Sequence, residues 1–85
     1  MKKATTKDEL FLLKLYEMAL KKGGPEEPVD RYSIGKAIGM QDHGIDNIIK
    51  HLAQANFIKK CTDNRIYLTP HGIKLVEHLK LERDV

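Results

Sequence analysis

Apolar residues recur at helical spacing near the start of the chain and predict a helix between Thr6 and Gly23. Thr6 and Glu9 have the spacing of a capping box, and Gly23 suits the left-handed end of a helix. Lys7, Lys14, Glu17 and Lys21 form one polar stripe, and apolar residues fill most of the remaining circumference: Phe11, Leu12, Leu13, Leu15, Tyr16, Met18, Ala19 and Leu20. This helix should therefore contact neighbours on more than one side, either inside its own domain or partly through a dimer interface.

Two shorter helices are predicted after a loop of proline and glycine at residues 23–29. Asp30 is expected to cap the first, which ends at Ile38 before Gly39. Asp42 is expected to cap the second, which continues to Ala55. The positions expected to face inward are Ile34, Ala37, Ile38, Ile45, Ile48, Ile49 and Leu52.

The hydrophobic period then changes from that of a helix to that of strands. Residues 57–61 and 65–68 are β-prone and flank a turn at 62–64, which is the pattern of a β-hairpin. Thr69 and Pro70 are typical first residues of a helix, which should run to about Glu82. Its inward positions are Ile73, Leu75, Val76 and Leu79. We expect residues 1–5 to form a flexible basic tail and residues 83–85 to fray.

Composition restricts the class of protein. A chain of 85 residues has room for one domain, placed at residues 6–82, and no stretch is apolar enough to span a membrane. The N-terminus lacks a secretory signal, and a single cysteine excludes an internal disulfide, so we expect a cytoplasmic location. No catalytic grouping is recognisable, and His71 and His78 lie too far apart to share a metal. We therefore expect no enzyme activity, metal or cofactor.

The spacing between residues 34 and 48 predicts two helices that cross at a steep angle. Gly35 removes side-chain bulk where the helices approach, and Gly39 allows the positive φ of a tight turn. Met40, Ile45 and Ile48 then hold the second helix against the first. The second helix would project its outer face, as a helix that enters a DNA major groove must do.

From these residues the chain resembles the winged helix-turn-helix domains of MarR- and ArsR-like transcriptional regulators. The resemblance rests on Asp30–Met40 for the first helix and turn, Gln41–Ala55 for the recognition helix, and Phe57–Leu68 for the wing. It covers roughly residues 6–82. The resemblance implies a mainly α fold with a small β-hairpin: two helices, a turn, a recognition helix, the hairpin and a closing helix.

The candidate DNA-contacting residues come from the recognition helix, the helix before it and the wing. The amides of Asn47 and Gln54 could pair with adenine, and Lys50 could reach a guanine edge or a phosphate. Cations of the wing and of the preceding helix would neutralise phosphates, and Arg65 could enter the minor groove. The full set is Gln41, His43, Asn47, Lys50, Gln54, Lys36, Arg31, Lys59, Lys60 and Arg65.

These features predict a small regulator that binds double-stranded DNA, either sequence-specifically or generally. A net charge of +3 permits an anionic partner without requiring one. A homodimer through the first and last helices would pair two recognition helices about one turn of DNA apart. The alternative is a winged-helix module that binds protein in a larger assembly, because Asp42 and Asp46 on the recognition helix would repel phosphates.

Overall fold

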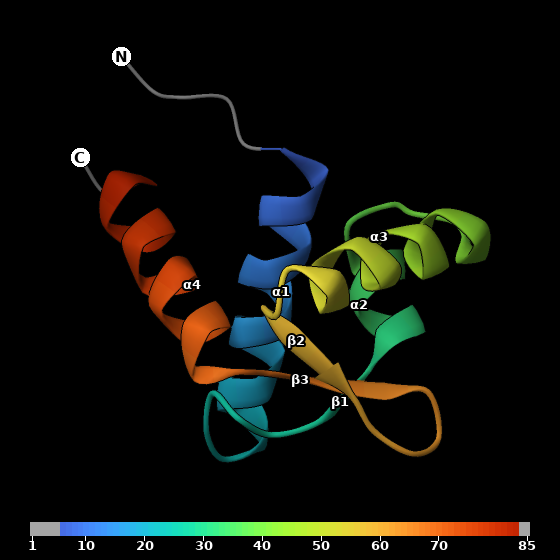
Figure 1. Cartoon of the computed structure of the whole chain (residues 1–85), viewed down its shortest axis with the longest axis horizontal. Coiled ribbons are helices and arrows are strands. Elements are labelled where there is room, and N and C mark those ends of the chain that lie inside the picture. Colours follow the sequence, from blue (N-terminus) through green and yellow to red (C-terminus); the bar gives the residue numbers. More distant parts are fainter. Residues whose placement is uncertain (1–5, 84–85) are drawn as a thin grey trace.

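The computed structural model describes residues 6–83, so the predicted tail at 1–5 and the chain end at 84–85 lie outside the described residues. Three helices precede a hairpin, and a fourth follows it (Figure 1). The elements are α1 (Lys7–Lys22), β1 (Val29–Asp30), α2 (Arg31–Ala37), α3 (Asp42–Gln54), β2 (Ile58–Lys60), β3 (Arg65–Leu68) and α4 (Pro70–Arg83). The predicted mainly α fold with a small antiparallel hairpin after the third helix is confirmed, and its order is compatible with a winged helix.

Helix α1 runs through the middle of the molecule and packs against α2, α4 and the sheet (Figure 1). Its capping box is complete: the Glu9 amide donates to Thr6 Oγ1 at 3.1 Å, and the Thr6 amide donates to Glu9 Oε1 at 3.0 Å. Gly23 ends the helix with a φ of +144°. Phe11, Leu12, Leu15 and Ala19 are buried, whereas Leu20 is 45% exposed. The wide apolar arc is therefore only partly used by the core of its own domain.

The sheet has one strand more than the predicted hairpin. Val29 and Asp30, expected at the end of a loop and at a helix cap, form β1 and pair with Ile66 and Arg65 of β3. The strand order is β1-β3-β2, with β3 in the centre. The prediction of a loop over all of 23–29 is wrong at Val29, because a two-residue strand has no recognisable period. Its pairing partner lies more than thirty residues away in the sequence.

The turn between α2 and α3 departs from the prediction at two residues. Asp30 caps α2 as predicted, accepting from the Ser33 amide at 2.9 Å, and Gly39 adopts a φ of +82°. Asp42, however, is the first residue of α3, and Gln41 is its N-cap without a side-chain cap hydrogen bond. Gln41 takes this place because its carbonyl accepts from the Ile45 amide at 3.0 Å, which closes the first turn. Ala37 is exposed instead of buried, although Ile38 beside it packs half-buried against the core.

Helix α4 begins at a tightly bonded corner. The buried Thr69 hydroxyl donates to the Asn56 carbonyl at 2.6 Å and accepts from the Gly72 amide at 3.0 Å. This confirms Thr69 as the cap of α4, with Pro70 as its first residue. Val76 and Leu79 are buried, and Ile73 and Leu75 pack half-buried against the core. The corner thereby connects the end of α3 to the start of α4.

Candidate nucleic-acid interface

Helix α3 has one buried and one solvent-facing side. Ile45, Ile48, Ile49 and Leu52 are at most 7% exposed and hold the helix against the domain. The opposite side is formed by exposed polar residues, among them all five candidates predicted on or next to this helix. These candidates are Gln41, His43, Asn47, Lys50 and Gln54. The spacing of isoleucines and leucine along the sequence thus correctly separated the buried side from the exposed side.

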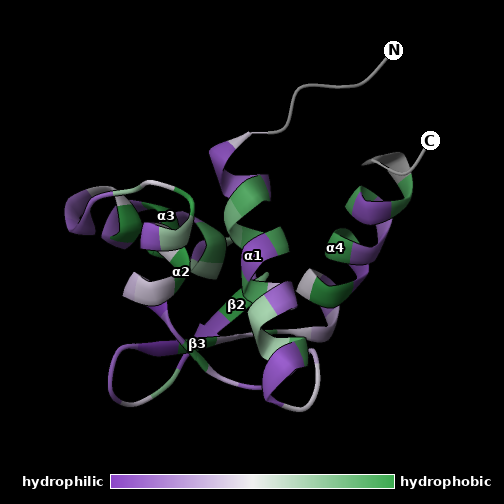
Figure 2. Cartoon of the chain, turned by 180° about the vertical axis from the view of Figure 1, so that it is seen from behind, coloured by the Kyte–Doolittle hydropathy of each residue, from purple (hydrophilic) through white to green (hydrophobic). Residues whose placement is uncertain are grey.

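The hairpin formed by β2 and β3, residues 58–68, is called the wing below. Its loop and α3 lie at the same end of the molecule, away from α4, in both Figure 1 and Figure 2. The loop is fixed to the start of α2, because the Arg31 amide donates to the Asn64 carbonyl at 3.0 Å. Strand β1 adds a second attachment to β3. The backbone around residues 29–31 therefore holds the wing against the start of α2.

Arg31, a predicted phosphate contact, is directed inward. Its side chain is 14% exposed, with Nη1 3.8 Å from Asp46 Oδ1 and Nε donating to the Asn64 carbonyl at 3.3 Å. The Tyr32 hydroxyl donates to the same Asp46 oxygen at 3.0 Å. This cluster joins the start of α2, α3 and the wing loop. It also partly neutralises the carboxylate that would repel a phosphate from the exposed side of α3.

Ionisation of Tyr32 provides a test of this cluster. The hydrogen bond to Asp46 raises the pKa of the Tyr32 phenol above its ordinary value. The bond should therefore stabilise the fold at and below the usual tyrosine range and be lost as pH rises through the raised pKa. The difference in tyrosinate absorbance between wild type and Tyr32→Phe reports the ionisation of Tyr32. We expect its midpoint to lie above the ordinary pKa of tyrosine, and to shift to lower pH when both proteins also carry Asp46→Asn. An unchanged midpoint in the Asp46→Asn pair would contradict the hydrogen bond.

The remaining predicted cations are distributed unevenly. Lys36 lies 3.9 Å from Asp42 with both side chains 66% exposed, a surface pair that contributes little. On β2, Lys59 pairs with Tyr67 and Lys60 with the buried Ile66. Since successive side chains of a strand point to opposite faces, the two lysines leave the sheet on different sides. Both are exposed.

Arg65, expected near the tip of the wing, is half-buried, and its Nε donates to the Thr62 carbonyl at 3.4 Å. The tip carries Asp63 and Asn64, whose φ values are +59° and +61°. The structure therefore does not gather Lys59, Lys60 and Arg65 into a single cationic patch. No ion pair within residues 6–83 involves Lys50, Lys59 or Lys60, so these three lysines remain available to an external anion.

Sequence reasoning missed Tyr32 as a member of this site. Tyr32 and Asp46 are 14 residues apart and meet only because the turn brings α2 across α3. No local signal marks such a pair. Strand β1 was also missed, although Val29 after Pro28 is a weak β signal.

The described residues offer few other sites for chemistry. Among residues 6–83 no group of three or more His, Cys, Asp or Glu side chains could hold a metal ion. No helix in the same range has the length and apolar character needed to cross a membrane. Cys61 is a half-buried free thiol.

Comparisons with protein-family models, curated proteins and solved structures found no match. The fold is therefore assigned from its own architecture. It is a small domain of four helices and a three-stranded antiparallel sheet, arranged in the order of a winged helix.

Proposed function

We propose that this chain is a small transcriptional regulator of the MarR- or ArsR-like type that binds double-stranded DNA. In this proposal α3 enters the major groove and the wing contacts the adjacent backbone. The observation that carries it is the exposed polar side of α3 at the same end of the molecule as the wing. The buried isoleucines on the opposite side of α3 pack against the domain and keep the polar side exposed.

The exposed side chains of α3 carry hydrogen-bonding groups that can bond the edges of bases. Asn47 and Gln54 carry amides that can bond the N6 and N7 positions of adenine, and Lys50 can donate to guanine or phosphate. Lys59 and Lys60 supply charge on the two faces of the wing. We leave Arg31 and Arg65 out of the proposed contacts, because both side chains are already bonded within the domain.

The low net charge makes salt dependence the decisive measurement. Each lysine that contacts a phosphate releases about one counterion, so its loss should reduce the slope of log affinity against log salt by about one. We expect wild-type protein to bind a fluorescent duplex in an anisotropy titration, with affinity falling as salt rises. Lys50→Ala, Lys59→Ala and Lys60→Ala should each weaken binding, and those lysines that contact phosphate should also flatten the slope.

Lys74→Ala serves as the matched control. It removes the same charge from an exposed position on α4, away from α3 and the wing. We expect it to leave the slope close to that of wild type. Absent or salt-independent binding by wild type would contradict the proposal, and so would equal losses in Lys74→Ala and Lys50→Ala.

A second candidate function is favoured by the acidic residues of α3. Asp42 and Asp46 keep 66% and 53% of their side-chain surface exposed, and two of the predicted cations are bonded internally. A winged helix that binds protein would tolerate this balance. Failure to bind any duplex at low salt, together with stoichiometric capture of one protein that Asn47→Ala releases, would favour this function over DNA binding.

A further inference from the structure

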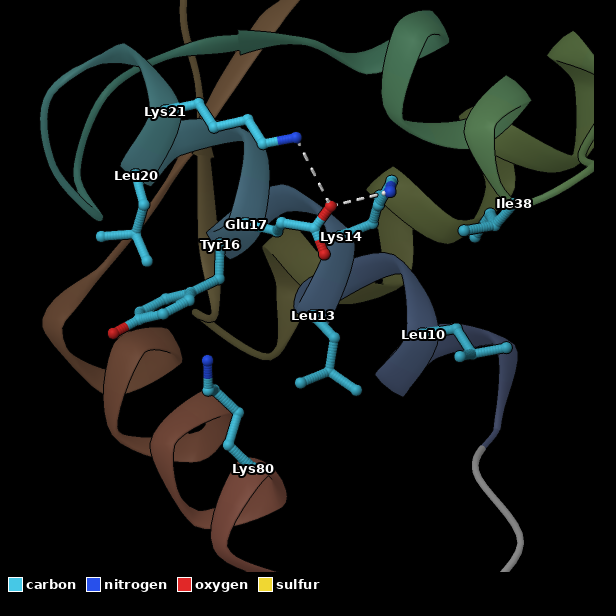
Figure 3. Close-up of a pocket in the computed structure, with 9 residues that line it drawn as sticks. All are labelled: Leu10, Leu13, Lys14, Tyr16, Glu17, Leu20, Lys21, Ile38 and Lys80. Atoms are coloured by element: carbon cyan, nitrogen blue, oxygen red, sulfur yellow. Dashed lines mark hydrogen bonds and ion pairs between the residues drawn. The ribbon is translucent and has the colours of Figure 1, made fainter. Parts of the chain in front are cut away.

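Two carboxylates of this chain are held in different ways. On α1, Lys14 Nζ and Lys21 Nζ lie 2.9 and 4.0 Å from Glu17 Oε1, beside an apolar groove (Figure 3). All three side chains belong to one helix and reach solvent, and exposed pairs of this kind hold a carboxylate only weakly. Asp46 on α3 is held instead from another helix, by two half-buried side chains of α2. Its orientation is therefore set by the tertiary fold.

The two groups that hold Asp46 contact the same carboxylate oxygen. The Tyr32 hydroxyl donates to Asp46 Oδ1 at 3.0 Å, and the Tyr32 side chain packs against the core. Arg31 Nη1 lies 3.8 Å from that oxygen, and Arg31 Nε is bonded to the Asn64 carbonyl. Within residues 6–83 no hydrogen bond or ion pair involves Asp46 Oδ2. One oxygen therefore fixes the carboxylate, and the other can accept from a donor outside the domain.

Asp46 lies where a recognition helix contacts bases. It is near the N-terminal end of α3, at the edge of the exposed side next to α2, and 53% of its side chain is exposed. Residues in this part of a recognition helix reach base edges in the major groove. The Arg31 guanidinium offsets part of the negative charge, and Lys50, one turn further along, is exposed beside it. A fixed acceptor at this place can approach DNA despite its charge.

We propose that Asp46 determines base specificity by accepting, through Oδ2, a hydrogen bond from the N4 amino group of a cytosine in the major groove. A carboxylate can only accept, and cytosine presents a donor there. Guanine and thymine present acceptors, and adenine places its N7 acceptor beside its N6 donor. Cytosine is therefore the base that suits Asp46 best. This role rests on the proposed binding of double-stranded DNA and adds the base that one residue of α3 would read.

The first experiment compares the duplexes that wild type and Asp46→Asn select from a pool with a randomised centre. In Asp46→Asn a neutral amide oxygen can still accept from Tyr32, whereas an NH₂ donor takes the place of Oδ2. We expect wild type to enrich a motif with cytosine at one fixed position. Asp46→Asn should enrich the same motif without cytosine at that position, because two donors would then face each other.

Anisotropy titrations with three fluorescent duplexes measure the size of this effect. Wild type should bind the selected duplex about tenfold more tightly than one in which thymine replaces that cytosine. Asp46→Asn should lose this preference or reverse it, since thymine offers the O4 acceptor in place of the N4 donor. On a third duplex of unrelated sequence, Asp46→Asn should bind at least as tightly as wild type, because it carries one negative charge fewer. A purely structural role of Asp46 would weaken binding to all three duplexes.

Two further variants separate charge from orientation. Asp42→Asn removes the same charge from the same helix, at a carboxylate that lies 3.9 Å from the exposed Lys36, and should keep the cytosine preference. Tyr32→Phe retains the Asp46 carboxylate but releases Oδ1, so it should reduce the preference and leave the salt dependence unchanged. Urea unfolding of each variant checks that the domain is folded.

The outcomes distinguish this role from DNA binding itself. Duplex binding by wild type without a preferred cytosine would overturn the role of Asp46 and leave DNA binding standing. The same conclusion would follow if Asp46→Asn kept the cytosine preference, or if Asp42→Asn lost it to the same extent. If wild type bound no duplex at low salt, the proposed function and the role of Asp46 would both be overturned.

Discussion

Replacing Gly72 with alanine is expected to destabilise the domain by about 3 kcal/mol, the upper end of the usual cost of overpacking. A Cβ at Gly72 would collide with the backbone carbonyl of Phe57 and approach Leu68 Cδ2 to 3.1 Å. The Phe57 carbonyl is itself fixed, because it accepts from the Thr69 amide at 3.1 Å. The added Cβ and the Phe57 carbonyl are both fixed by the backbone, so no change of rotamer can relieve the collision. The corner that connects the end of α3 to the start of α4 would have to open.

The stability of Gly72→Ala relative to wild type is measured by thermal and urea unfolding. A loss of this size should lower the Tm of so small a domain by more than about 10 °C. Gly44→Ala is the control, since its Cβ would meet only Met40 Cε at 3.5 Å, an ordinary contact. In α3 that change should stabilise the protein by about 0.5–1 kcal/mol through helix propensity. Equal stability of the two variants would show that the corner is not tightly packed.

Replacing Gly35 with alanine should cost about 2 kcal/mol for a different reason. The added Cβ would collide with Cγ1 and Cδ1 of Ile45, which is fully buried where α2 crosses α3. Here the obstacle is a side chain instead of backbone. The isoleucine could leave its position only by displacing other core residues, so the crossing of the two helices would loosen.

A double-mutant cycle separates this clash from other effects. Ile45→Ala alone should be strongly destabilising, by about 2–5 kcal/mol, because it opens a cavity. In that background the colliding atoms are gone, and Gly35→Ala should become neutral or stabilising through its helix propensity. The sign of the Gly35→Ala effect on urea unfolding should therefore reverse between the two backgrounds. If Gly35→Ala lowers stability by the same amount in both backgrounds, the collision with Ile45 is not the cause of its cost.

Much of the fold follows from interactions between neighbours in the sequence. The capping box at Thr6 and Glu9, the caps at Asp30 and Thr69, and the turn at Gly39 each involve residues at most a few positions apart. Such hydrogen bonds and backbone preferences act in the same way in any fold, so their residue patterns are informative alone. The buried side of α3 belongs to the same class, because helical spacing places its apolar residues on one side.

The candidate site depended more on contacts between distant segments. The exposed side of α3 could be predicted, but the engagement of Arg31 with Asp46 and Asn64 could not, since these residues lie on three different elements. The separation of Lys59 from Lys60, in contrast, follows from the alternation of side chains along a strand and needs no distant contact. The composition gives only the number of cations. Burial and hydrogen bonding in the folded chain decide which of them can bind an external anion.

The amino-acid sequence by itself determined, to within one residue, where the helices begin and end, which side of α3 is apolar, and that a hairpin follows the third helix. Only the tertiary structure decided that Val29 and Asp30 become a strand, that Ala37 stays exposed, and which cations remain available. The physical reason is the range of the forces involved. Capping and periodicity act within a few residues, whereas strand pairing, desolvation and ion pairing depend on which distant segments the folded chain brings together.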